Sequence, residues 1–431
     1  MDPIMVIPNY STNKKGEIIM GKVGPILATC ILTITISGFL VKQNQPVTNN
    51  AEKEFYFQQF GHWWKAMGEI FEDPWSSDIG EEHMRKMIEI DRKFLVPLGP
   101  KALPYLIVLE QFDPWIGRAI AMISKFEPHN IVLQEGNGRL STTEEFPHIV
   151  ERDVYFDARK IFLHWWLKGS NSVSKWFQER YAQWLTLKRK GETNEAKEVE
   201  EWLRFQNEPW ERYKRGRKLT PFQKLLDIGI AAIPLWVEKL EIEINKSIRE
   251  AIMLALNTLT DGEIKSTMSP QECLNWWQEN KERWTVPFPK SKREFLEWLE
   301  KEGWEEQRLA IPCVITISRL EDEGAIDALL RFLRHPSSSV RGKSLEQIMI
   351  LFGEQLPKEY ALGIGTDGWE RIGDLMEMGK YDLVRKKLME AKKKVRDEKV
   401  ADNIARELSR WWQENRGRVK IYWQRAWEIY H

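Results

Sequence analysis

Three stretches of this chain share one pattern of glycine, alanine and apolar residues. LGPKALPYLIVLE (98–110) and IGIAAIPLWVEKL (228–240) carry Gly, Ala and Pro at matching positions, and EGAIDALLRFLRH, from Glu323, keeps the Gly-Ala opening without the proline. Their apolar residues recur every three or four positions, as on the buried face of an amphipathic helix. Each stretch therefore predicts a helix, and the repetition predicts a fold built from related helical units.

A second pattern follows each of these stretches. DPWIGRAIAMI begins at Asp113, NKSIREAIMLAL at Asn245 and SSSVRGKSLEQIMI at Ser337. Asp, Asn and Ser are favourable N-cap residues, and an apolar helical pattern continues from each of them. Each copy is thus predicted to be two antiparallel helices joined by a tight turn. An arginine follows the turn in every copy, and we expect it to bridge neighbouring units: Arg118, Arg249 and Arg341.

These paired motifs resemble HEAT-like (armadillo-type) helical repeats of the bacterial type, near 98–127, 225–262 and 322–353. The resemblance implies an all-α fold, an α-solenoid of antiparallel helix pairs with insertions. The copies lie much further apart in the sequence than the ~40 residues of an uninterrupted array. Further helix pairs therefore lie between them, or the unit is larger than one pair.

Paired tryptophans accompany the repeats. The pentapeptide WWQEN occurs twice, and the chain has 21 Trp. Trp residues seven or eleven positions apart fall within about 20° of one another around a helix, so that they form one stripe. We expect a Trp-Trp helix after each repeat, with at least one ring of the pair packed between helices and Gln and Glu facing water. These helices are predicted near 163–177, 272–284 and 407–427.

The two WWQEN doublets have a second interpretation. Exposed aromatic side chains stack on sugar rings and anchor peptides, so the doublets would instead line a concave binding surface. The candidate partner-binding residues are Trp276, Trp277, Trp411 and Trp412.

The N-terminal part contains one apolar run. VGPILATCILTITISGFLV (23–41) has no charged residue and is close to the length of a membrane-spanning helix. We interpret it as a signal anchor or transmembrane helix after a leader at 1–22. A cleaved export signal and a buried core helix are the alternatives. A polar linker at 42–54 and a helical-repeat domain at 55–431 are expected to follow.

The lysines around the apolar run predict its orientation. Three lie before it and two in the segment after it, which favours a cytoplasmic N-terminus. The large C-terminal domain is then extracytoplasmic on a single-pass membrane protein, or secreted if the signal is cleaved. The lipid bilayer is one expected partner, through 23–41.

Charge and cysteine usage exclude several classes of protein. The formal net charge is +0, with 64 basic and 64 acidic residues, so the basic footprint of a nucleic-acid-binding protein is absent. Cys30, Cys273 and Cys313 are the only cysteines. They are too few for a disulfide scaffold, and we expect isolated buried thiols.

Catalytic motifs are nearly absent. The sequence has no CxxC, HExxH, GxSxG or P-loop pattern, and its seven His are scattered. GIGTDG (363–368) fits GxGxxG, but no strand or βαβ pattern surrounds it, so a loop that caps the next helix is expected. A loop or hairpin is predicted over 130–156, and two charged helices over 174–215 are predicted to stand out from the stack.

The sequence therefore favours a non-catalytic scaffold without cofactor or metal that binds a protein partner along an extended surface. One alternative is a glycan or cell-wall binding module that uses exposed Trp. The other is an enzyme with a site in a 130–220 insertion, where two convergent carboxylates or His148 with His164 would form it.

Overall fold

The structure, a computed structural model, is helical in nearly all its regular elements. It describes residues 10–12, 18–20, 49–70, 81–126, 150–207, 219–362, 381–423 and 425–428. The exception is one antiparallel pair of three-residue strands, β1 (Tyr10–Thr12) and β2 (Ile18–Met20), with Tyr10 opposite Met20. The all-α prediction is confirmed.

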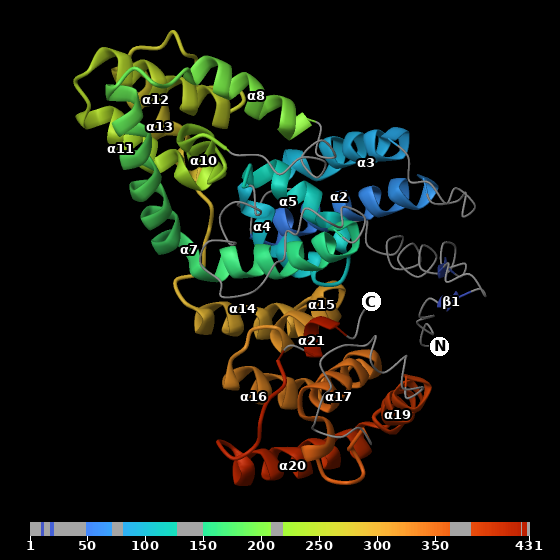
Figure 1. The fold of residues 1–431 in the computed structure, drawn as a ribbon. Coiled ribbons are helices and arrows are strands. Elements are labelled where there is room, and N and C mark those ends of the chain that lie inside the picture. The colour runs from blue at the N-terminus through green and yellow to red at the C-terminus, as the bar shows by residue number, and fades with distance from the viewer. Residues whose placement is uncertain are drawn as a thin grey trace.

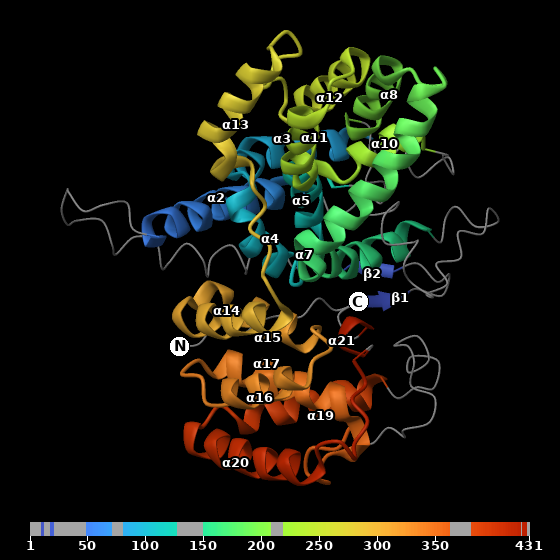
Figure 2. The same cartoon turned by 90° about the vertical axis from the view of Figure 1, so that its left-hand side faces the viewer.

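The helices form stacked layers (Figures 1 and 2). The middle layer contains α2 (Asn49–Ile70), α3 (Glu81–Phe94), α4 (Leu103–Glu110), α5 (Gly117–Ser124) and the first part of α7 (Val150–Arg189). Above it lie α8 (Glu195–Asn207), α10 (Pro221–Leu226), α11 (Ile233–Ile242), α12 (Lys246–Leu259) and α13 (Pro270–Trp284). Below it lie α14 (Lys292–Glu305), α15 (Gln307–Ser318), α16 (Glu323–Phe332), α17 (Ser338–Phe352), α19 (Tyr381–Lys394), α20 (Glu398–Asn415) and α21 (Arg425–Glu428).

None of the helices described is long and apolar enough to cross a bilayer. The predicted span at 23–41 and the leader are outside the described residues, apart from the two short strands. The predicted linker at 42–54 is too long, because α2 already begins at Asn49 and turns its aromatic residues Tyr56 and Phe57 into the core.

Each predicted repeat contains the expected two helices. They are α4 and α5 in the first, α11 and α12 in the second, and α16 and α17 in the third. The Asn245 side chain accepts a hydrogen bond from the Ile248 N–H (3.2 Å) at the start of α12, as its N-cap position predicts. Ser337 occupies the corresponding position before α17 without a side-chain cap.

The first two repeats match residue for residue. Gly99 and Gly229 both have a positive φ (68° and 73°) and both stand at the start of a 3₁₀ turn: Gly99 precedes η2 (Pro100–Ala102), and Gly229 is the first residue of η5 (Gly229–Ala232). Pro104 and Pro234 then stand in the first turn of the following helix. The third copy differs, because Asp322 caps α16 through the Gly324 N–H (2.8 Å) and no 3₁₀ turn intervenes.

The repeats are not stacked in chain order. The first repeat lies in the middle layer, the second above it and the third below it (Figure 2). Gly229 lies directly against the end of α5, where an added Cβ would be 2.1 Å from the Ser124 carbonyl oxygen. On the other side α4 packs on α15, which in turn packs on α16 and α17. This spatial order differs from that of a solenoid, in which consecutive repeats contact each other.

α17 also departs from the expected solenoid geometry. Every residue from Val340 to Phe352 is buried, because α15, α16, α19 and α21 all pack on this helix. A helix enclosed on several sides has no concave face to offer to a partner. The lower part of the molecule is thus a bundle around α17.

The charged segment 174–215 was predicted to stand out from the stack, and this is wrong. Its two helices form as expected, on either side of Gly191. However, Phe177 and Trp184 on α7 are buried against Trp236 of the second repeat. The charged residues occupy only the outer face, while aromatic residues spaced three and four apart form the inner one.

Two further boundaries need correction. The loop predicted over 130–156 ends before Val150, where α7 begins, and 127–149 is outside the described residues. The Trp-Trp helix predicted near 407–427 ends at Asn415, and the chain then runs back to the middle of the molecule to form α21.

Candidate functional site

The two WWQEN doublets do not meet. Trp276 and Trp277 lie on α13 at the upper end, and Trp411 and Trp412 lie on α20 at the lower end (Figures 1 and 2). The second ring of each doublet is buried, and the first is half-buried. These four side chains therefore cannot line one common surface.

Helix geometry explains the repeated pentapeptide. The amides of Asn280 and Asn415 donate to the carbonyl oxygens of Trp276 and Trp411, four residues earlier, at 2.8 Å in both copies. Gln278 and Glu279, like their counterparts on α20, are exposed. In each WWQEN copy, one Trp ring packs inward, the other covers the edge of the core, and the Gln and Glu side chains face water.

The Trp doublet on α7 packs against the segment that connects the upper layer to the lower layer. Trp165 and Trp166 are fully buried on α7 and contact Phe288 at centroid distances of 5.1 and 5.6 Å. Phe288 lies in the connection that descends from α13 to α14 (Figure 2). Gly169, which interrupts α7 with φ of 60°, lies 3.5 Å from the same segment, measured from an added Cβ.

Several Trp side chains pair with acidic residues, which the sequence analysis did not predict. The Trp63 indole donates to Asp91 at 2.7 Å, and the Trp202 indole donates to Asp227 at 2.7 Å. Trp412 makes the corresponding bond to Asp327 at 3.0 Å. A buried indole N–H needs an acceptor, and a carboxylate is the strongest available. These pairs join separate helices and have no local sequence signal.

The three repeat arginines behave differently. The Arg118 Nε donates to Asp91 on α3 at 2.9 Å. Arg341 is buried and reaches the end of α19, where it donates to the carbonyl oxygens of Val395 (2.8 Å) and Arg396 (2.7 Å). Arg249 donates to the Glu243 carbonyl of its own turn. Two of the three thus bridge elements.

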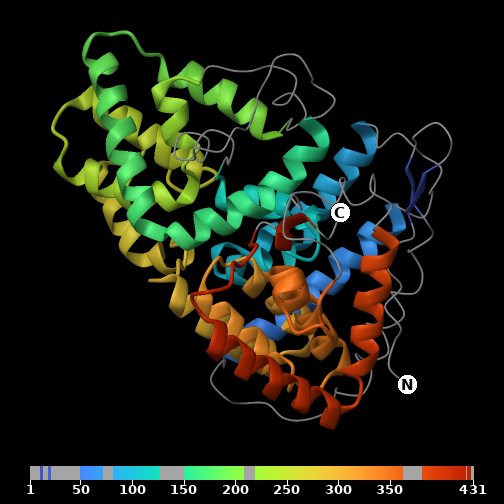
Figure 3. The same ribbon diagram turned by 60° about the horizontal axis from the view of Figure 1, so that its bottom comes forward.

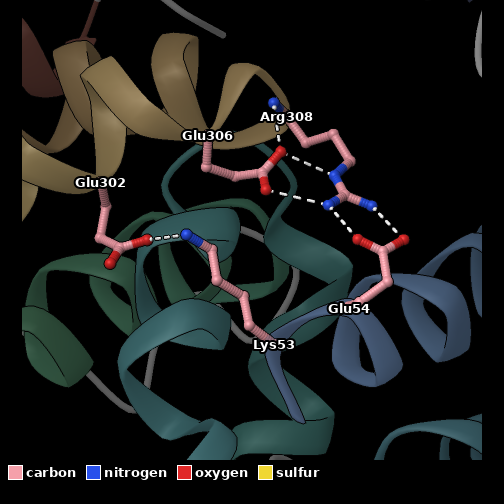
Figure 4. A network of polar contacts seen from close by, with 5 residues as sticks. All are labelled: Lys53, Glu54, Glu302, Glu306 and Arg308. Atoms are coloured by element: carbon pink, nitrogen blue, oxygen red, sulfur yellow. Dashed lines mark hydrogen bonds and ion pairs between the residues drawn. The ribbon is translucent and has the colours of Figure 1, made fainter. Parts of the chain in front are cut away.

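An ionic network fixes α2 to the lower half (Figure 4). Arg308 makes paired hydrogen bonds to both oxygens of Glu54 (3.0 and 2.7 Å) and to both oxygens of Glu306 (2.7 and 2.9 Å). Its guanidinium lies 4.2 Å from the centre of the Phe57 ring. Beside it, Lys53 pairs with the largely buried Glu302 at 2.5 Å.

The network stabilises the charged forms of its members. Hydrogen bonds from Arg308 lower the pKa of Glu54. Burial opposes ionisation of Glu306, but hydrogen bonds from Arg308 outweigh it and lower that pKa as well. Such bidentate pairs fix orientation, which suits a joint between helices far apart in the chain.

A second charged cluster lies at the centre of the molecule, around Glu110. This side chain is completely buried at the end of α4, and neither carboxylate oxygen has a hydrogen-bond partner among the described residues. Burial raises the pKa of Glu110 to about 8, although Arg159 and Arg319 oppose that rise. Gly117 leaves the space for it, since a Cβ there would lie 2.6 Å from Glu110 Oε1.

Arg319 connects this centre to the C-terminal helix. Its guanidinium donates to the Gln111 carbonyl and side chain (2.9 and 3.0 Å) and to the Ala426 carbonyl of α21 (3.1 Å). It also stacks over Trp427 at 4.8 Å. The buried cluster therefore joins α4, α15 and α21, and its closed setting suits a structural joint.

Glu110→Gln is predicted to remove a pH dependence of stability. Because the pKa of Glu110 is raised by folding, its contribution is fully present below about pH 4.5 and is lost as pH rises through about 8. The variant should be more stable than the wild type at pH 9 by roughly 3 kcal/mol and similar to it at pH 5. Urea unfolding at both pH values measures this. The exposed Glu279→Gln should change nothing, and an unchanged pH slope in Glu110→Gln would contradict the assignment.

The other residues singled out in the sequence form no further candidate site among the described residues. Cys273 and Cys313 are free, buried thiols, as predicted, while Cys30 is outside the described residues. His164 is half-buried on α7, and His148 and the 363–368 loop are not among the described residues. No group of three or more His, Cys, Asp or Glu within the described ranges is placed to hold a metal ion.

Comparisons of this chain with protein-family models, curated proteins and solved structures find no match.

Proposed function

We propose that this protein is a non-catalytic helical-repeat scaffold of HEAT-like type, tethered to a membrane through 23–41 or exported, that binds another protein. The observation that carries the proposal is the outer face of α19. This helix lies at the outside of the lower end (Figure 3). Its inner stripe, Val384, Leu388, Ala391 and Val395, is buried.

Two apolar side chains remain on the outer face of α19. Leu383 is 47% and Met389 is 43% exposed. At about 100° per residue, both fall on the half of the helix that points away from the buried stripe, about 120° apart. Val400, at the start of α20, is 40% exposed close by in the sequence. Exposed apolar residues grouped in polar surroundings are typical of protein-binding surfaces.

The same face carries more unpaired positive than negative charge, since Asp382 and Glu390 are the exposed acidic residues of α19. Five cations on or next to it have no ion-pair partner within the described part of the chain: Lys386, Lys393, Lys394, Arg396 and Lys399. Elsewhere, cations such as the half-buried Lys53 and the exposed Arg308 form ion pairs within the fold. We define the α19 face as these five cations with Leu383, Met389 and Val400. It fits a partner with apolar and acidic side chains.

The glycan and enzyme alternatives have less support. A sugar-binding platform needs exposed Trp rings, whereas Trp277 and Trp412 are buried. The carboxylates Glu110 and Asp113 interact, but they precede the 130–220 segment and are enclosed in the joint between α4, α15 and α21.

A photo-cross-linking residue at position 389 tests the proposal. Expressed in the native host, the Met389 variant should yield a discrete protein adduct, and the same label at the exposed Gln278 on α13 should yield none. Alkaline washing of the membranes from the same culture should leave full-length protein in the pellet, or a shortened form outside the cell if the signal is cleaved. Equal adducts at positions 389 and 278 would refute the interaction surface. Full-length protein in the soluble fraction would refute both the membrane anchor and the export signal.

A further inference from the structure

A second exposed apolar site lies at the turn between α11 and α12. Ile242 is 65% and Ile244 is 86% exposed, the highest values among the large apolar side chains described. The turn is held in shape, because the Glu243 carboxylate accepts hydrogen bonds from the N–H groups of Ile244 (3.0 Å) and Asn245 (2.9 Å). These isoleucines are thus presented on a fixed backbone.

Negative charge surrounds this turn. Glu238, Glu241 and Glu243 have no ion-pair partner among the described residues. Two cations lie at the same turn: Lys246 is 3.9 Å from Glu250, and Arg249 donates to the Glu243 carbonyl. We define the α11–α12 tip as Ile242 and Ile244 with these three glutamates. It combines apolar side chains and carboxylates, which is the chemistry that the α19 face fits.

The two surfaces lie on opposite ends of the molecule. Figures 1 and 2 both show α11 and α12 in the upper layer and α19 and α20 in the lower one. The chain as a whole has zero formal net charge, so the excess of one sign at each end does not make whole molecules repel one another. Opposite charges at opposite ends favour approach in one orientation.

We infer that the partner of the α19 face is the α11–α12 tip of a second copy of this chain. This inference rests on the proposed scaffold function and names its partner. Ile242 and Ile244 of one copy pack on Leu383 and Met389 of the next, with glutamates facing lysines. Because each copy uses two different surfaces, the contact is head-to-tail and leaves both ends of a dimer open to further copies.

Two variants test this inference on the full chain in detergent. The tip variant is Ile242→Lys with Ile244→Lys, and the face variant is Leu383→Glu with Met389→Glu. All four positions are exposed, so folding should be unaffected. Sedimentation velocity should show wild-type mass rising with concentration and falling with added salt. Each variant alone should associate at least about tenfold more weakly, while Phe55→Lys, an exposed residue outside both surfaces, should behave as wild type.

Mixing the variants gives the decisive measurement. The tip variant keeps an intact face and the face variant keeps an intact tip, so the mixture should form one-to-one dimers and no longer species. Monomeric wild type at all concentrations, or a mixture that stays monomeric, would overturn the inference. If the wild type is monomeric but position 389 still cross-links another protein in cells, the scaffold function stands and only self-association fails.

The same proteins, after removal of the detergent, test for a lipid partner. They are mixed with phosphatidylcholine vesicles containing phosphatidylglycerol and floated on a density gradient. Flotation that depends on anionic lipid and is lost only in the face variant, without self-association of the wild type, would assign the α19 face to a membrane and overturn the inference.

Discussion

Gly229→Ala is expected to destabilise the protein by more than about 4 kcal/mol, among the largest effects of a single methyl group. The added Cβ would lie 2.1 Å from the Ser124 carbonyl oxygen and 2.6 Å from the Lys125 carbonyl carbon. Both atoms belong to backbone, so neither can rotate away as a side chain would. The second repeat would have to separate from α5, which opens the contact between the upper and middle layers. Urea unfolding followed by Trp fluorescence measures the loss.

The first repeat supplies the matched control. Gly99 occupies the same place in the motif and has nearly the same φ, but nothing lies within 4 Å of a Cβ added there. Gly99→Ala should therefore cost only the backbone strain of a left-handed alanine, about 1–3 kcal/mol. Equal losses at the two positions would mean that strain, and not the contact between layers, requires glycine at 229.

These two glycines also mark how far sequence could predict the fold. The matching Gly, Ala and Pro positions predicted two helix pairs of identical local design, and Gly99 and Gly229 share a backbone conformation. Local geometry depends on neighbours in the chain, so a repeated pattern shows it. The contact of Gly229 with α5 joins residues more than a hundred positions apart, and no feature of either motif encodes it. The order of the layers was therefore missed.

For the tryptophans, too, the sequence predicted the local orientation of the side chains but not their contact partners. Helical periodicity predicted that Gln278 and Glu279 face water and that at least one ring of each doublet packs inside, and this is confirmed. Periodicity does not predict which partner a buried ring meets. The carboxylates that accept the indole protons of Trp63 and Trp202 come from other helices. In the sequence, Asp227 is visible only as a charged residue in a largely apolar stretch.

The candidate binding surface was also only partly predictable from the sequence. The α19 face is partly visible in YDLVRKKLMEAKKKVR (381–396), whose lysines and apolar residues alternate at helical spacing. Its importance depends on which apolar residues the core uses, and this follows only from packing on α17. Leu383 and Met389 are left over once Val384 and Leu388 are buried. Sequence periodicity does not show which apolar residues the core uses, so the candidate binding residues chosen from the sequence were tryptophans.

Arg341→Met is the second substitution with a large expected effect. The buried guanidinium donates to the carbonyl oxygens of His335 (2.8 Å) and Pro336 (2.7 Å) in its own turn, and to Val395 and Arg396 at the end of α19. Methionine keeps the aliphatic packing but leaves these carbonyls without a donor. Charge-assisted hydrogen bonds of this kind are individually strong, and we expect a loss of about 3–5 kcal/mol. Hydrogen exchange should show α19 opening first.

Arg249→Met separates this role from the repeat motif. Arg249 stands at the corresponding position after the turn of the second repeat, but it donates to the Glu243 carbonyl of that same turn. Its loss should cost less than about 1 kcal/mol. Because α19 is held to α17 by Arg341 and carries the proposed binding face on its other side, Arg341→Met should also weaken self-association. Arg249 supports the turn of the α11–α12 tip, so Arg249→Met is the control for stability and for hydrogen exchange in α19 only. If the two substitutions had similar effects on hydrogen exchange in α19, Arg341 would stabilise only its own turn and would not position the binding face.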